Sequence, residues 1–188
     1  MAADWDRFTA FLLAARFDEV LLPAYIDESA PAVVRPFAFS VFLRAGDRWL
    51  RLSQVEQGDQ LEIAVVDRVE HDASLVEDPA VTAVTVDLTP QVLGEVDSFR
   101  ITEARGYLSA LSDPAAGRVA GLMLTAEPGG TLLFDPLWGS GIRVLPVAGP
   151  DAWPANRAPD GVVRWAQSAY GMSAMWWSSS SPTGAHDS

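Results

Sequence analysis

The sequence predicts an α+β fold, in which a mostly antiparallel sheet is built on a three-strand meander and an N-terminal and a C-terminal helix pack against it. Two patterns predict this fold. Apolar and polar residues alternate along consecutive runs between residues 37 and 66, and helical spacing of apolar residues occurs near both ends of the chain. At 188 residues with 49% hydrophobic content, the chain is long and apolar enough for one such domain.

The N-terminal helix is predicted from Asp4, which can cap it, and from Trp5, Phe8, Leu12 and Ala15, which fall on one face. We expect this helix to end near residue 16. Residues 17–23 fit either a last helical turn or a short strand, and the segment from there to residue 36 reads as a loop because it contains two prolines.

The meander is the clearest structural pattern in the chain. Strands are predicted over residues 37–44, 48–55 and 61–66, with turns at 45–47 and 57–59. Links of a few residues do not permit a parallel crossover, so the three strands should be antiparallel neighbours.

Further strands are predicted in the second half of the chain. Residues 81–88 alternate in polarity and predict a strand, and residues 118–126 are also predicted to be a strand, whereas 99–105 fit either a strand or the start of a helix. Residues 131–134 and 142–145 are short apolar runs bounded by glycine and proline, and we expect them to close the sheet begun by the meander.

The C-terminal helix is predicted from Val162, Trp165, Ala166 and Ala169, which share a helical face before Gly171. We therefore expect a single domain over residues 1–177. Residues 178–188 form a serine-rich tail that should be mobile, because its composition cannot bury a core.

The composition excludes several chemistries. The chain has no cysteine and no lysine, which excludes thiol nucleophiles, cysteine-ligated metals, Schiff bases and a P-loop lysine. All basic residues are arginine, which fits the bias of a GC-rich, bacterial-type genome. Of the two histidines, His186 lies in the serine-rich tail and His71 lies in an acidic loop without a nucleophile motif beside it. We predict no catalytic residue, no metal site and no cofactor, and we favour a protein that is not an enzyme.

The charge and the N-terminus constrain partners and location. A net charge of −12 argues against nucleic acid and against an anionic membrane as partners. The first residues contain early acids and no sustained apolar run, unlike a secretory signal, and no stretch is long enough for a membrane helix. The sequence therefore predicts a cytoplasmic protein.

Acidic residues concentrate in one part of the chain. Residues 56–103 contain 12 carboxylates and two arginines, a net charge of −10. We expect them to form an exposed negative surface and hypothesise an acidic binding module that engages a basic partner protein, as immunity proteins, antitoxins or inhibitors do. The alternative is that these charges only keep the protein soluble. The predicted partner-binding residues are Glu56, Asp59, Glu62, Asp67, Glu70, Asp72, Glu77 and Asp78.

An alternative site lies in the Gly-rich and Pro-rich span of residues 129–146. Asp135, Trp138 and Arg143 could provide an acceptor, an aromatic platform and a guanidinium for a small-ligand-binding protein or a carboxylate-dependent hydrolase. A structural interpretation makes Trp138 part of the core and Asp135 a turn cap. The sequence leaves open whether Asp135 and Arg143 pair with each other.

Homo-oligomer formation is a further possibility. It would bury Trp153, Trp176 and Trp177, which have no assigned place in the predicted core.

Overall fold

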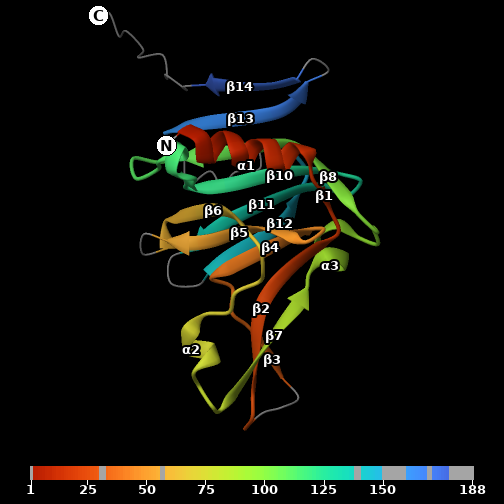
Figure 1. The fold of residues 1–188 in the computed structure, drawn as a ribbon, viewed down its shortest axis with the longest axis vertical. Coiled ribbons are helices and arrows are strands. Elements are labelled where there is room, and N and C mark those ends of the chain that lie inside the picture. Colours follow the sequence, from red (N-terminus) through yellow and green to blue (C-terminus); the bar gives the residue numbers. More distant parts are fainter. Residues whose placement is uncertain are drawn as a thin grey trace, which may run out of the picture.

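The chain folds into two antiparallel β-sheets packed face to face, with one substantial helix packed against them (Figure 1). The structure is a computed structural model. It describes residues 2–29, 33–55, 58–137, 141–149, 160–168 and 171–177, and of these it describes the backbone alone at 2–7, 137, 163–168 and 171–177. The predicted α+β class with two flanking helices is therefore wrong, because strands dominate the described chain and the C-terminal helix is absent from it.

The first sheet contains the predicted meander. β4 (Ser40–Ala45), β5 (Arg48–Val55) and β6 (Gln60–Val66) pair in antiparallel order, which confirms that part of the prediction. The sheet has the order β3-β2-β4-β5-β6-β9, and β7 pairs with the other edge of β2. The remaining strands are β2 (Glu19–Asp27), β3 (Val34–Pro36), β7 (Val81–Asp87) and β9 (Arg118–Val119).

The second sheet is organised around β8 (Phe99–Leu108), the strand whose helical or extended state the sequence left open. Its order is β12-β11-β10-β8-β13-β14, and β1 also pairs with β8. The other strands are β1 (Arg16–Phe17), β10 (Gly121–Glu127), β11 (Gly130–Leu137), β12 (Gly141–Val147), β13 (Gly161–Ser168) and β14 (Gly171–Trp177).

Two predictions about the second half of the chain are wrong. The segment expected to be the C-terminal helix forms β13, which lies between β8 and β14, so both of its edges are hydrogen-bonded. Its valines and tryptophan suit a strand once such neighbours exist, and the chain-local helical spacing did not reveal those neighbours. In addition, β11 and β12 extend the second sheet through β10 and do not join the meander.

The hydrophobic core lies between the two sheets. Leu43, Leu50 and Leu52 from the first sheet are fully buried against the same cluster as Leu122 and Phe134 from the second. The two sheets therefore share one core, and each covers the apolar face of the other.

The helix α1 (Ala2–Ala14) covers one end of this core, as predicted from its apolar spacing. Phe8 and Leu12, one turn apart, are 4% and 0% exposed. The other helices are short: α2 (Ala73–Val76), α3 (Thr89–Leu93) and a 3-10 turn at Pro114–Ala116. Within the described chain, no helix has the length and apolar character needed to cross a membrane.

Two glycines allow close approaches that position the sheets. Gly117 has a φ of 75°, and a β-carbon there would lie 2.8 Å from the carbonyl oxygen of Ile63 in β6. Gly141 has a φ of 89°, and a β-carbon there would lie 2.6 Å from the carbonyl oxygen of Ala38. Both positions exclude other residues by conformation and by space.

A three-stranded arm extends from the sandwich (Figure 1). β2 begins in the core, where Val20 and Leu22 are buried, and continues outward to Asp27. In this outer part it pairs with β7 on one edge and with β3 on the other, and α2 contacts β7. Residues 24–27 of β2 and all of β3 were predicted to be a loop, because Pro31 and Pro36 were interpreted as breakers, whereas β7 lies in the strand predicted over residues 81–88.

The aromatic contact between β1 and β8 should be a major source of stability. Phe17 and Phe99 stack with ring centroids 5.6 Å apart, and both side chains are fully buried. Phe99→Ala should lower the free energy of unfolding by about 3–5 kcal/mol, through lost burial and the cavity left behind. Urea denaturation measures the loss. Leu111→Ala is the control: Leu111 is 60% exposed, so the change should be within about 0.5 kcal/mol. Equal effects of the two variants would contradict this account of the core.

Candidate functional site

The structure divides the predicted acidic surface into two parts. Glu62, Asp67 and Glu70 lie on the sandwich, on β6 and directly after it, and Asp59 lies just before β6. Asp72, Glu77 and Asp78 lie on the arm, around α2. Glu56, the remaining predicted residue, lies outside the described residues.

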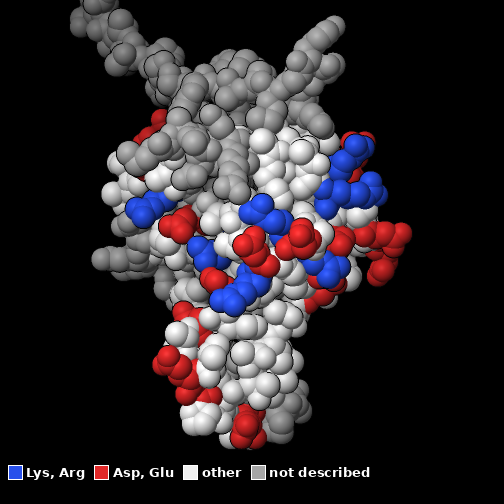
Figure 2. Space-filling model, in the orientation of Figure 1, with Lys and Arg blue, Asp and Glu red and all other residues white. Residues whose placement is uncertain are grey.

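On the sandwich, arginines from neighbouring strands offset the carboxylates. Arg51 of β5 contacts Glu62 at 3.5 Å and Glu70 at 3.2 Å. Arg48 contacts Asp67 at 3.1 Å, and Arg118 of β9 lies 3.9 Å from Glu62. Figure 2 shows the result as basic and acidic side chains side by side across the sandwich. Arginines from outside residues 56–103 thus reduce the negative charge that the sequence count assigned to this region.

On the arm the compensation is weaker, although Arg44 of β4 is close enough to Asp87 for a charge interaction. We define the arm as residues 22–37 and 72–88, of which 30–32 are outside the described residues. These two segments contain six carboxylates against the single arginine Arg35, a formal net charge of −5. Figure 2 shows acidic residues along the border and tip of the arm and no basic residue on it in that view. The six carboxylates are Asp27, Glu28, Asp72, Glu77, Asp78 and Asp87.

The arm also exposes apolar side chains. Val33 and Val34, at the β3 side, are each 48% exposed, and Val76 on α2 is 65% exposed. Among the described residues these are three of the five large apolar side chains that are most exposed. Val33 and Val34 belong to the β3 edge and Val76 to the β7 side, so exposed apolar side chains occur at both edges of the arm together with its carboxylates. Exposed apolar side chains near charged ones can serve a protein contact, in which the apolar part supplies affinity and the charges supply steering.

Sequence reasoning missed part of this surface. Asp27 and Glu28 were placed in a loop, and Asp87 was counted among the acids but not selected as a site residue. The alternation of Leu22, Ala24 and Ile26 was the available signal, because period-2 spacing continues β2 beyond Pro23.

Local hydrogen bonds fix two of the arm's carboxylates. Oδ1 of Asp72 accepts hydrogen bonds from Oγ of Ser74 at 2.5 Å and from N of Ser74 at 2.9 Å, and so caps α2. These bonds, the side-chain bond first, lower the pKa of Asp72. Asp27 forms the same pair of bonds with Ser29, which lowers its pKa in the same way. In both cases the serine hydrogen bonds favour the ionised carboxylate.

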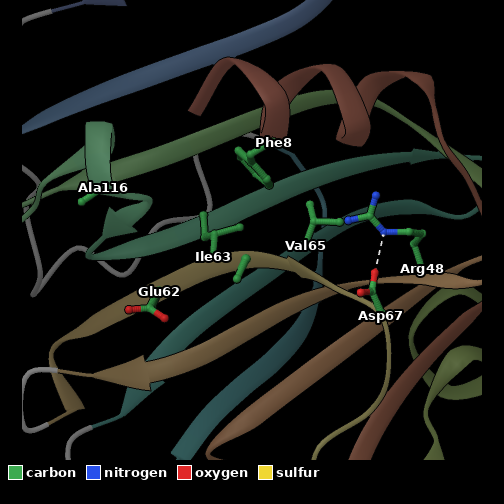
Figure 3. A pocket seen from close by; sticks show the side chains of 8 residues that line it. Phe8, Arg48, Glu62, Ile63, Val65, Asp67 and Ala116 are labelled. Carbon is green, nitrogen blue, oxygen red and sulfur yellow. Dashed lines mark ion pairs between the residues drawn. The ribbon is translucent and has the colours of Figure 1, made fainter. Parts of the chain in front are cut away.

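A hollow of about 380 Å³ lies on the sandwich between α1 and β6 (Figure 3). Figure 3 shows Phe8 and Val65 on its apolar side and the Arg48–Asp67 ion pair beside it. The guanidinium of Arg48 also lies 5.9 Å from the ring centroid of Phe11. The charged side chains among the described residues that line this hollow are each in an ion pair: Arg48 with Asp67, and Glu62 with Arg51. The hollow therefore offers little free charge to select a ligand.

The alternative site differs from what a ligand loop would need. Asp135 and Arg143 pair directly across β11 and β12, and Arg143 Nη2 donates to Asp135 Oδ2 at 2.6 Å. Asp135 is 1% exposed, whereas Arg143 is 41% exposed. Trp138 lies outside the described residues. The structure thus answers the open question: the two charged residues bind each other, and the carboxylate is not accessible from solvent.

Metal ligands do not converge in the described part of the chain. No group of three or more His, Asp or Glu side chains there is arranged to hold an ion, and this includes the neighbours Glu70, His71 and Asp72. Trp153 lies outside the described residues, as does the serine-rich tail 178–188, and the side chains of Trp176 and Trp177 are not described.

Comparison with known proteins gives no match: no family model, no curated protein and no solved structure is similar to this chain. The functional argument therefore depends on the surface of the arm.

The Asp72–Ser74 bonds predict a specific pH response. Ser74→Ala should raise the pKa of Asp72 toward its ordinary value, because the largest cause of the lowering is removed. A carboxylate with a lowered pKa stabilises the fold above its unfolded pKa of about 4, and this contribution is lost as the pH falls through the folded pKa. Carboxyl-carbon NMR titration measures the shift. Ser29→Ala is the matched control, because it should move the pKa of Asp27 and leave Asp72 unchanged; the reverse pattern would contradict the assignment.

The buried Asp135 predicts a structural role that can be tested. Asp135→Ala should lower the free energy of unfolding by about 2 kcal/mol or more, because it removes a buried acceptor and leaves the Arg143 guanidinium without this bond. Thermal and urea denaturation measure the change. Asp47→Ala, at an exposed turn position, should change stability by less than about 0.5 kcal/mol. Nearly unchanged stability in Asp135→Ala would instead favour the ligand-loop interpretation.

Proposed function

We propose that this protein is a non-enzymatic binding module whose arm engages a basic partner protein, in the manner of an immunity protein, an antitoxin or an inhibitor. The observation that carries the proposal is the separation of charge. Glu62, Asp67 and Glu70 on the sandwich lie beside arginines, whereas the two segments of the arm combine six carboxylates with one arginine. This arrangement concentrates unbalanced negative charge where the chain protrudes.

The shape of the arm supports the same proposal. A protruding element with carboxylates on its border can enter a concave basic surface, and its field accelerates association without requiring a large contact area. The exposed Val33, Val34 and Val76 supply apolar contacts that a charge pattern serving only solubility does not need. A basic protein with apolar residues inside its binding surface is therefore the partner that fits.

The hydrolase or small-ligand alternative has less support. It requires an accessible carboxylate near Arg143, and Asp135 is buried and bound to that arginine. Its other component, Trp138, is not among the described residues. We therefore propose no catalytic role for these residues.

Neutralising the arm should weaken capture of the partner. The arm variant combines Glu28→Gln, Glu77→Gln and Asp78→Asn; the asparagine keeps the acceptor Oδ1 that caps Ala80 at 2.8 Å. The control variant combines Glu95→Gln, Asp97→Asn and Glu127→Gln, which removes three exposed charges from the rest of the chain. Each protein serves as bait in the source organism's extract, and the partner captured by the unmodified chain is then purified.

Association kinetics with the purified partner decide the matter. The association rate constant should be lower by on the order of tenfold for the arm variant than for the unmodified chain. Raising the salt concentration should slow association of the unmodified chain more than association of the arm variant. The control variant should behave like the unmodified chain. An acidic partner would contradict the proposal, as would equal effects of the two variants or rates insensitive to salt.

A further inference from the structure

The outer edge of β7 has main-chain groups without partners. Leu88 N donates to Val20 O at 2.8 Å, and Glu28 N donates to Ala80 O at 3.0 Å. Along an antiparallel ladder, hydrogen-bonded residue pairs alternate with non-hydrogen-bonded pairs. The two bonds show which pairs of the β2–β7 ladder are hydrogen-bonded, and counting from them makes Tyr25↔Ala83 and Pro23↔Thr85 non-hydrogen-bonded pairs. The N–H and C=O groups of Ala83 and Thr85 therefore point away from β2.

Nothing in the described chain fills these positions. No hydrogen bond from the described residues reaches the main chain of Ala83 or Thr85, and β7 pairs with β2 alone. Four main-chain groups, two donors and two acceptors, are thus presented in one row.

Apart from Asp87 at its end, the β7 sequence also lacks the residues that usually protect an edge strand against strand addition. β7 reads Val-Thr-Ala-Val-Thr-Val-Asp, a seven-residue run without proline, lysine or arginine. The opposite edge of the arm, β3, has three residues and contains Arg35 and Pro36. Short, charged and proline-containing edges resist pairing, whereas a longer edge rich in β-branched residues accepts it.

We propose that β7 receives an extended segment of the basic partner by strand addition, so that the partner continues the sheet of the arm. This inference rests on the proposed function and specifies its geometry. Glu77 and Asp78 precede the edge, and Asp87 ends it. The segment therefore has about seven residues, spans roughly 20 Å, and carries basic residues at both ends with β-branched residues between them.

Charge distinguishes this partner from a second copy of the chain. Pairing two β7 edges would bring together two arms of formal charge −5, with carboxylates at both ends of each edge. Like charges oppose that contact, whereas a basic segment is attracted by them.

A peptide probe tests the edge directly. The probe is an acetylated and amidated heptapeptide with arginine at both ends and alternating valine and threonine between them. Its control has the same sequence with N-methyl groups on the three central residues, which keeps the charge and prevents strand pairing. Amide exchange by NMR should slow by about tenfold or more at Ala83 and Thr85 with the first peptide and remain unchanged with the second.

Substitutions at Thr85 provide a second measurement. Thr85→Pro removes the outward N–H without breaking the ladder to β2, and should weaken binding of the probe by about fivefold or more. Thr85→Ala keeps the N–H and should retain binding within about twofold. Should the proline variant fail to fold, the exchange experiment on the unmodified chain still decides the question.

The outcomes separate the inference from the proposed function. Suppose that both peptides bind, that neither slows amide exchange at Ala83 and Thr85, and that only the Glu28, Glu77 and Asp78 substitutions weaken their binding. This result would overturn strand addition and leave the proposed function standing. Failure of the arm variant to affect partner capture would overturn both. Suppose instead that sedimentation shows the unmodified chain to be a dimer and that Thr85→Pro dissociates it. That result would assign the β7 edge to a second copy of the chain and overturn the proposal that a partner segment binds there.

Discussion

The arm depends on a small set of hydrogen bonds at the point where β2 leaves the sandwich. Thr89 is 4% exposed; its Oγ1 accepts a bond from Val20 N at 2.8 Å and donates to Asp87 Oδ1 at 2.6 Å. On the other side of β2, Phe37 N donates to Pro23 O at 2.8 Å. Buried polar groups are expensive to leave unpaired, so the Thr89 bonds hold β2 and β7 in one arrangement where they leave the core, and the Phe37 bond holds the segment between β3 and β4 against β2. The ladders of β2 with β7 and β3 continue this arrangement along the arm.

Pro23 shows how the sequence tolerates this geometry. A proline inside a strand lacks a donor, yet β2 needs none there. Pro23 lies between the part of β2 that pairs with β4, ending at Leu21, and the part that pairs with β3, beginning at Ala24. In the ladder with β7, Pro23 and Thr85 form a non-hydrogen-bonded pair, so the ladder needs no donor from Pro23. The proline thus falls where β2 changes neighbours on one edge, and the ladder continues past it on the other.

The sequence predicted the elements whose partners are close along the chain. The meander and α1 follow from local spacing and short turns, and both are present. β13 was misassigned because Val162, Trp165 and Ala166 fit a helical face, and the strands that stabilise its extended form are β8, more than 50 positions earlier, and β14. The site was only partly predictable for the same reason. The charge count identified the acidic segment of residues 56–103. Only the fold shows that Arg48, Arg51 and Arg118 approach its carboxylates on the sandwich and not those on the arm.

In the proposed function, the negative charge of the arm has two roles. An exposed edge with β-branched residues invites self-association, and residues 81–86 of β7 include no charge and no proline that would prevent it. The carboxylates at both ends of the edge oppose pairing between copies of the chain, while the same charges attract a basic segment. A surface that only had to remain soluble could shorten the edge or place a proline in it, as β3 does with Pro36. Retaining an open edge and surrounding it with one sign of charge is an arrangement that discriminates between partners, because it excludes like-charged strands and admits oppositely charged ones.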